Sequence, residues 1–90
     1  MSELKEKCGI VGIYGPGLQV SRLCFFALFA LQHRGQEASG ITTNDSDKLL
    51  THKGVGLVSQ VYREEDIDNL SGDIGIGHNR YSTSAGGALH

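Results

Sequence analysis

The sequence predicts an α+β fold with layered packing. The first observation is the order of its predicted elements, which is strand, helix, hairpin and strand. The second is its composition, since 39% of the 90 residues are hydrophobic and 20% are charged, as in ordinary globular proteins. The third is its length, because a chain this short corresponds to one small domain whose stability on its own is marginal.

Residues 9–14 are predicted to form the first strand, because they are rich in β-branched residues and a Gly-Pro-Gly cluster ends the run. Side chains alternate between the two faces of a strand, so Val11 and Ile13 share one face. The other face carries Cys8, Ile10, Gly12 and Tyr14. Cys8 therefore opens the strand.

Residues 20–33 are predicted to form a helix, with Gly35 as its C-terminal stop. Cys24 lies on the apolar stripe of this helix, where a free cysteine usually packs as a small hydrophobic residue. Phenylalanines widen the stripe almost to a full circle, so we expect the helix to be buried between layers. The stripe consists of Val20, Leu23, Cys24, Ala27, Leu28 and Leu31, widened by Phe25, Phe26 and Phe29.

Residues 38–43 and 48–53 are predicted to be two strands of a hairpin, because the turn-forming residues 44–47 join them. Residues 63–70 are predicted to form a short acidic helix. Residues 73–78 return to a strand, in which two isoleucines point to one face and two glycines leave the other face bare. A bare face lets another layer or a ligand approach closely.

Charge and composition exclude several classes of function. A net charge of −2 lacks the basic patch that nucleic acid or an anionic membrane requires. The charged residues 1–7 lack the apolar core of a secretory signal, and the apolar run 23–31 is far shorter than the roughly 20 residues of a membrane helix. We therefore expect a cytoplasmic chain with reduced cysteines and with neither nucleic acid nor membrane as a partner.

Two common kinds of site are disfavoured by the spacing. Neither the C-x-x-C nor the H-x-x-x-H pairing of a zinc site occurs, so we expect no metal site. The stretch 54–56 resembles the start of a dinucleotide-binding loop, but Ser59 stands at the third glycine position. We interpret this stretch as a turn.

Cys8 has two interpretations. A cysteine at the start of a strand is often a buried core residue. If residues 1–7 are removed, however, Cys8 becomes N-terminal, and its α-amino group, with a pKa near 7.7–8.0, can act as general base for a thiol with a pKa of about 8.5. The amide nitrogen of an intact Lys7–Cys8 bond cannot take that proton. Under this hypothesis residues 1–7 are a cleaved leader.

Four blocks of sequence together resemble the amidophosphoribosyltransferase family of class II glutamine amidotransferases. They occur in the family's order and span nearly everything from Cys8 onward. Tyr81 resembles this family more than the glucosamine-6-phosphate synthase branch, the alternative amidotransferase, which usually carries tryptophan after the arginine. The blocks are CGIVGIYG from Cys8, LQHRGQEASGI from Leu31, HKGVGLVSQVY from His52 and IGHNRYSTSAGG from Ile76.

The resemblance implies an N-terminal nucleophile hydrolase fold, with stacked antiparallel sheets and flanking helices, of which residues 8–90 would be the first part. In this family a cysteine attacks the side-chain amide of glutamine, forms a thioester and releases ammonia. A second domain uses the ammonia to convert phosphoribosyl pyrophosphate into phosphoribosylamine, the first committed step of purine biosynthesis. The resemblance also makes residues 1–7 look like a cleaved leader and implies a homo-oligomer at full length.

The resemblance assigns roles to individual residues. Cys8 would be the nucleophile, and Arg80 would bind the α-carboxylate of glutamine, for which a planar guanidinium is well suited. Tyr81 would be a wall of the site or a core residue. The other expected site residues are Thr83 and Ser84, which would line the glutamine pocket, and Arg34 and Gly35, which would shape the loop facing the thiol.

Several parts of the family pattern would lie beyond residue 90. They are the Asn-Gly pair of the oxyanion hole, an aspartate for the substrate's amino group, the transferase domain with its Mg²⁺, and the iron–sulfur ligands of some members. Because losing one oxyanion donor costs about 100- to 1000-fold in rate, we expect these 90 residues to be a truncated domain, inactive alone and without a cofactor. Two non-enzymatic alternatives are a redox protein using Cys8 and Cys24, and a non-catalytic interaction module.

Overall fold

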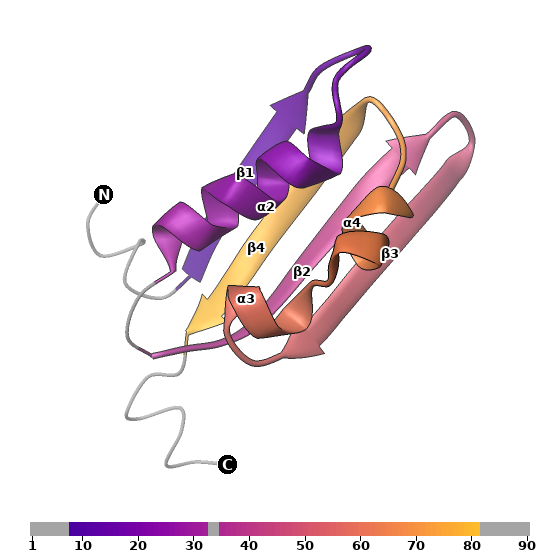
Figure 1. Ribbon diagram of the computed structural model, residues 1–90. Coiled ribbons are helices and arrows are strands. Elements are labelled where there is room, and N and C mark those ends of the chain that lie inside the picture. The colour runs from indigo at the N-terminus through magenta and orange to yellow at the C-terminus, as the bar shows by residue number, and fades with distance from the viewer. Residues whose placement is uncertain (1–7, 33–34, 82–90) are drawn as a thin grey trace.

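A four-stranded antiparallel sheet covered on one face by three helices forms the described part of the chain (Figure 1). The computed structural model describes residues 8–32 and 35–81. The strands are β1 (Cys8–Tyr14), β2 (Gln36–Asp45), β3 (Lys48–Val55) and β4 (Ile74–Tyr81), and the helices are α2 (Val20–Leu31), α3 (Val58–Val61) and α4 (Glu64–Asp68). Their order across the sheet is β1-β4-β2-β3.

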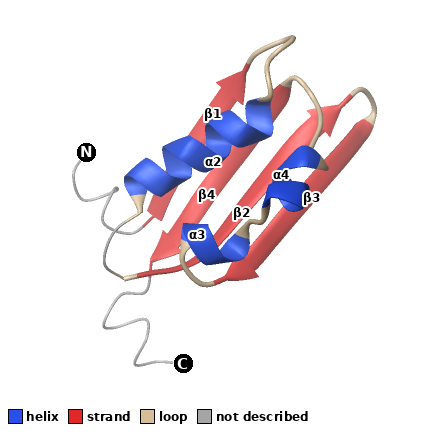
Figure 2. Ribbon diagram, in the orientation of Figure 1, coloured by secondary structure: helices blue, strands red, loops and turns tan. Residues whose placement is uncertain are grey.

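The helices all lie on the same side of the sheet, as Figure 2 shows. Helix α2 packs over β1 and β4, and α3 packs over β2 and β3. We call this side the covered face and the opposite side the open face. The α+β prediction is confirmed, and the described residues form a single antiparallel sheet with flanking helices.

The hairpin between β2 and β3 is confirmed and is longer than predicted. Asp45 pairs with Lys48, so the turn consists of two residues, and the first of them, Ser46, has φ 59°. A positive φ at this position is typical of the tight turns that match the twist of two paired strands. The strand predicted over residues 73–78 is also confirmed. It is β4, one of the two central strands of the sheet, and it continues to Tyr81.

Two glycines of β4 let α2 lie close to the sheet. A Cβ added at Gly75 would lie 2.6 Å from Val20 Cγ1, and a Cβ added at Gly77 would lie 2.8 Å from Leu28 Cδ1. Both distances are far below ordinary contact, so only glycine allows this approach. The predicted bare face of β4 is therefore filled by α2.

Helix α2 differs from the prediction in what covers it. Cys24 and Leu28 are fully buried, which confirms the predicted core role of Cys24, but Phe26 and Phe29 are 56% and 49% exposed. The expectation of a helix buried between two layers is therefore wrong for the described residues. The reason is that the sheet covers only one side of α2, and no other described element packs on the outward side that carries these two rings.

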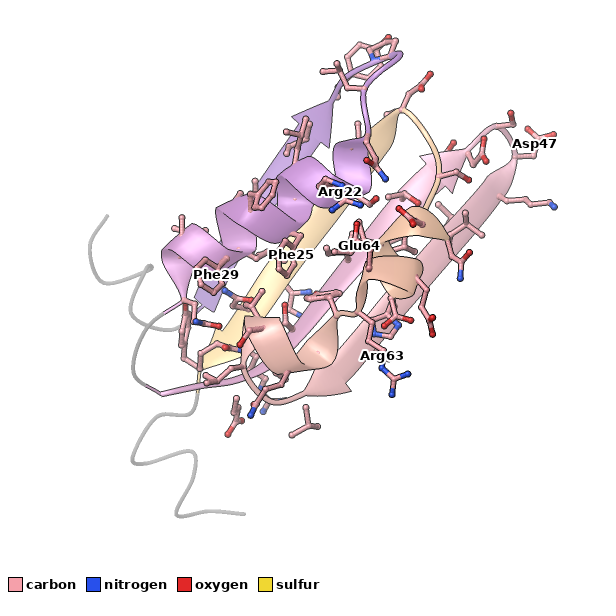
Figure 3. All side chains as sticks on the ribbon, viewed as in Figure 1. Arg22, Phe25, Phe29, Asp47, Arg63 and Glu64 are labelled. Atoms are coloured by element: carbon pink, nitrogen blue, oxygen red, sulfur yellow. The ribbon has the colours of Figure 1, made fainter. Side chains whose placement is uncertain are left out.

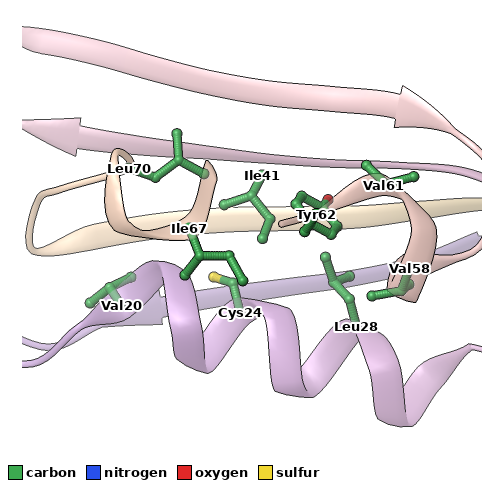
Figure 4. Close-up of a cluster of buried hydrophobic side chains, with 9 residues drawn as sticks. All are labelled: Val20, Cys24, Leu28, Ile41, Val58, Val61, Tyr62, Ile67 and Leu70. Carbon is green, nitrogen blue, oxygen red and sulfur yellow. The ribbon is translucent and has the colours of Figure 1, made fainter. Parts of the chain in front are cut away.

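The core lies between α2, the two short helices and the covered face of the sheet (Figure 4). Helix α3, only four residues long, was not predicted, whereas the predicted acidic helix is present as α4. Figure 3 shows Arg22 of α2 directed toward Glu64 of α4, and the two form an ion pair that links these helices. The core consists of Val20, Cys24, Leu28, Ile41, Val58, Val61, Tyr62, Ile67 and Leu70.

A chain of buried polar side chains crosses this core. Asn79 Nδ2 donates to the carbonyl oxygen of Leu28 at 2.9 Å, and its Oδ1 accepts from Ser39 Oγ at 2.8 Å. Ser39 Oγ is in turn 2.8 Å from the hydroxyl of Tyr62. Burial is the main cause that raises the pKa of Tyr62 to about 12, so this hydroxyl stays protonated as a hydrogen-bond donor.

Candidate active site

The end of the sheet where β1 begins and β4 ends brings two predicted site residues together. Cys8 of β1 is the register partner of Arg80 in β4, and Arg80 is also the partner of Ala38 in β2. Opposite residues of an antiparallel pair have Cβ atoms about 4.5–5.5 Å apart. The predicted site residues Cys8 and Arg80, separated by most of the sequence, are thus direct neighbours in the sheet.

Arg80 lies on the open face of β4. Exposed and buried residues alternate along this strand, and the Arg80 side chain is 66% exposed. A guanidinium in such a position can offer its planar fork of N–H donors to a carboxylate from solvent. The geometry is therefore compatible with recognition of an amino acid at this end of the sheet.

A β-bulge brings a carboxylate to the same place. The register of β2 on β4 shifts between Gln36, which pairs with Tyr81, and Ala38, which pairs with Arg80. Glu37 is the extra residue, and its Oε2 lies 3.8 Å from Nε of Arg80. Bulges frequently re-aim a side chain next to a functional site.

Tyr81 lies on the covered face, on the other side of the strand from Arg80. It is 5% exposed, and its hydroxyl donates a hydrogen bond to the carbonyl oxygen of Leu31, the last residue of α2. This bond satisfies one of the free carbonyls at the end of the helix. Tyr81 thus fixes the end of β4 to the end of α2 from within the core.

Two glutamines near the connection between α2 and β2 share one hydrogen-bond donor. Gln32 Oε1 accepts a hydrogen bond from the backbone N–H of Val58 at 2.7 Å, and Gln36 Oε1 accepts from the same N–H at 3.1 Å. Gly35 has φ +94°, a conformation that L residues with a side chain rarely adopt. This geometry explains the glycine, while α2 itself ends four residues earlier, at Leu31.

Three of the predicted site residues cannot be placed. Arg34, Thr83 and Ser84 lie outside the described residues, and of Cys8 the structure describes the backbone. Conversely, Glu37 and the two glutamines were not singled out from the sequence as site residues. The glutamines on either side of the Arg34-Gly35 pair are the signal that could have indicated side-chain hydrogen bonds here.

The second cysteine, Cys24, lies in an environment that makes a thiol unreactive. Cys24 is fully buried among apolar side chains, and this burial raises the pKa of its thiol. Because the thiolate is the reactive form, a buried thiol of raised pKa reacts slowly. This disfavours a redox protein that would use Cys24 together with Cys8.

Two kinds of feature are absent from the described residues. No group of three or more His, Cys, Asp or Glu residues within residues 8–32 and 35–81 could hold a metal ion. In the same part of the chain, no helix has the length and apolar character that spanning a membrane demands.

Comparison with known proteins gives consistent results. No family model matches the chain. It is 58% identical over 86 residues to amidophosphoribosyltransferase 2, chloroplastic, from Arabidopsis thaliana, and 51% identical over 85 residues to the amidophosphoribosyltransferase of Methanothermobacter thermautotrophicus. These alignments cover 94% and 92% of this chain but only 15% and 18% of the relatives.

Solved structures agree with the sequence comparison. One, described as the allosteric regulatory enzyme of purine biosynthesis, matches with a TM-score of 0.76 and 40% identity over 87% of this chain and 17% of its own. Another, the glutamine phosphoribosylpyrophosphate amidotransferase from B. subtilis complexed with ADP and GMP, matches with a TM-score of 0.74 and 39% identity over 83% and 16%. By sequence and by fold, the chain is similar to amidophosphoribosyltransferases, and it spans 15% and 18% of the length of the two curated relatives named above.

Proposed function

We propose that this chain carries the glutamine-hydrolysing centre of an amidophosphoribosyltransferase, with Cys8 as the nucleophile. The observation that carries the proposal is the register pairing of Cys8 with Arg80, because it sets a thiol-bearing residue beside an exposed guanidinium. The names of the relatives support the reaction class. Glutamine is the substrate that this pair would recognise at its two ends.

The reaction begins with a proton transfer. Removal of residues 1–7 gives Cys8 a free α-amino group, which takes the thiol proton while the sulfur attacks the side-chain carbonyl carbon of glutamine. The carbon–nitrogen bond breaks, ammonia leaves with the proton, and a γ-glutamyl thioester remains on sulfur. Water then cleaves the thioester, releasing glutamate and restoring the thiol. In this scheme the seven-residue leader blocks the base until it is cut.

Arg80 binds the α-carboxylate of glutamine through two parallel N–H···O contacts, which a glutamine within a polypeptide cannot offer. Thr83 and Ser84 line the same end of the pocket, and Arg34 with Gly35 shapes the loop toward the thiol. The transfer of ammonia to phosphoribosyl pyrophosphate, the Mg²⁺ for that step and homo-oligomer formation are assigned to the rest of the full-length enzyme.

The test is Cys8→Ser in the full-length protein that carries this sequence. Phosphoribosylamine synthesis from glutamine should fall by more than about 1000-fold, because serine is a far weaker nucleophile at neutral pH, whereas synthesis from ammonia should persist. Cys24→Ala serves as the control, since it removes the other thiol and should leave both activities in place. Equal loss of both activities in Cys8→Ser would contradict the assigned role.

The alternatives predict other outcomes. A glucosamine-6-phosphate synthase type of enzyme would hydrolyse glutamine but would not use phosphoribosyl pyrophosphate as the acceptor. An interaction module without catalysis would keep its Lys7–Cys8 bond and would not react with an electrophilic glutamine analogue. Measuring acceptor use and analogue labelling on one preparation separates these possibilities from the proposal.

A further inference from the structure

We propose that Glu37 is a positioning residue that holds Arg80 on the β2 side of the site and so tunes the site for glutamine over the shorter asparagine. This inference rests on the proposed function, in which Cys8 and Arg80 take the two ends of the substrate. Nothing in the sequence pattern singled out Glu37 for this part. The bulge, the ion pair and the order of the strands support this role.

The bulge delivers the Glu37 side chain to the open face. Without a bulge, strict alternation from Ala38, the partner of Arg80, would direct position 37 to the covered face. Instead, Glu37 is exposed and its carboxylate oxygen lies 3.8 Å from Arg80 Nε. The irregularity in β2 therefore has a specific result, which is to bring a negative charge beside the candidate carboxylate-binding cation.

Groups other than the Glu37 side chain hold the bulge in place. The carbonyl oxygen of Glu37 accepts a hydrogen bond from the N–H of Gly56 at 2.7 Å. The buried Gln36 side chain donates through Nε2 to the carbonyl oxygens of Gly56, at 2.7 Å, and Ala38, at 3.0 Å. Changing the Glu37 side chain should therefore leave the local backbone intact, and its effect can be measured separately from folding.

The contact with Glu37 leaves one edge of the Arg80 guanidinium free to bind a substrate carboxylate. Glu37 approaches Nε, the nitrogen closest to the backbone. The two terminal nitrogens form the fork that a substrate carboxylate would take in a two-point contact. A carboxylate beside Nε attracts the guanidinium from that side without occupying that fork.

The strand order determines the direction in which Glu37 attracts the Arg80 guanidinium. Arg80 lies between Cys8 of β1 and Ala38 of β2, and neighbouring strands are about 4.8 Å apart. Glu37 comes from β2, so its attraction draws the cationic group away from β1, where Cys8 lies. A longer gap between thiol and guanidinium suits glutamine, because its side chain is one methylene longer than that of asparagine.

The experiment compares Glu37→Gln, Glu37→Asp and unchanged full-length protein for hydrolysis of glutamine and asparagine. Both partners are largely exposed, and exposed pairs contribute modestly, so Glu37→Gln should raise KM for glutamine about two- to fivefold with little change in kcat. The preference for glutamine over asparagine in kcat/KM should fall by a similar factor. Glu37→Asp, which keeps the charge, should recover part of the loss.

Glu65→Gln is the matched control. Glu65 also forms an exposed ion pair at 3.8 Å, with Arg63, but it lies on α4, away from the candidate site. It should change neither KM nor the preference. Ammonia-dependent synthesis should be the same in all variants, which reports that the fold is intact.

Three results would overturn the inference while leaving the proposed function standing. One is an unchanged KM in Glu37→Gln where Arg80→Lys raises it. Another is a lower KM, which would mean that Glu37 competes with the substrate carboxylate. The third is a fall in kcat alone. Absence of glutamine hydrolysis in the unchanged protein would instead overturn the proposed function, and the inference with it.

Discussion

The two faces of strand β4 differ in the residues they carry and in what covers them. On the covered face, Gly75 and Gly77 lie directly under α2, and Asn79 and Tyr81 bond to its backbone carbonyls. On the open face, exposed residues alternate with these and end at Arg80. Every second residue of β4 therefore contacts α2, and the residues between them face the side of the sheet on which Arg80 lies.

Substitutions on the two faces should therefore have different consequences. The covered face has no spare volume, so added atoms there should cost stability. Among the described residues no element covers the open face, so changes there should leave the stability of this part of the chain largely unaffected. A pair of substitutions of the same type on the two faces tests this directly.

The largest effect is expected from Gly75→Val. Its Cβ would lie 2.6 Å from Val20 Cγ1 and 3.1 Å from Cys24 Sγ, so α2 would have to move away from the sheet. Overpacking of this kind should lower the free energy of unfolding by about 3 kcal/mol, measured by urea unfolding. The matched control is Gly12→Val on the open face of β1, where a Cβ would meet no atom within 4 Å.

Gly12→Val should change the free energy of unfolding by less than about 0.5 kcal/mol. Valine is favoured in strands, so both substitutions have the same backbone preference and differ only in what the side chain meets. Equal destabilisation by the two variants would contradict the distinction between a filled face and an open one.

A smaller effect concerns Tyr62, which is 6% exposed in the covered core. Burial raises its pKa from 10.0 to about 12, so below pH 10 the hydroxyl is neutral in both the folded and the unfolded chain. Between pH 10 and 12 the unfolded chain loses the proton while the folded chain keeps it. Stability should therefore fall over this window by about 2 kcal/mol as the pH rises.

Tyr62→Phe should remove this alkaline loss. At neutral pH it should cost about 0.5–1.5 kcal/mol, because the hydrogen bond with Ser39 disappears. Tyr14→Phe, on the open face where the ring is 73% exposed, should change the neutral-pH value by less than about 0.5 kcal/mol. An undiminished alkaline decline in Tyr62→Phe would show that another group causes it.

Local periodicity explains which parts of the fold were predictable. The alternation in residues 74–77 and the helical spacing of Cys24 and Leu28 each depend on neighbours in the sequence, and both were confirmed. The exposure of Phe26 was not predictable, because an apolar ring in a helix does not indicate whether a further layer is present to cover it. Helix α3 is a single turn, too short for a periodic signal.

In the candidate site, too, local sequence patterns do not predict contacts between distant parts of the chain. Cys8 and Arg80, to which the resemblance assigned roles, are register partners, but a register between distant strands cannot be obtained from spacing along the chain. The position of Glu37 depends on a bulge that hydrogen bonds from Gln36 and Gly56 hold in place. Such an irregularity follows from tertiary contacts, and for this reason the sequence pattern did not indicate Glu37.

The most direct test of the central claim is an intact-mass measurement on the full-length protein, with and without an electrophilic analogue of glutamine. The account predicts a polypeptide whose first residue is Cys8 and which gains a single adduct on that residue. A protein that retains Lys7 and still hydrolyses glutamine at a normal rate, or an adduct located on Cys24, would contradict it.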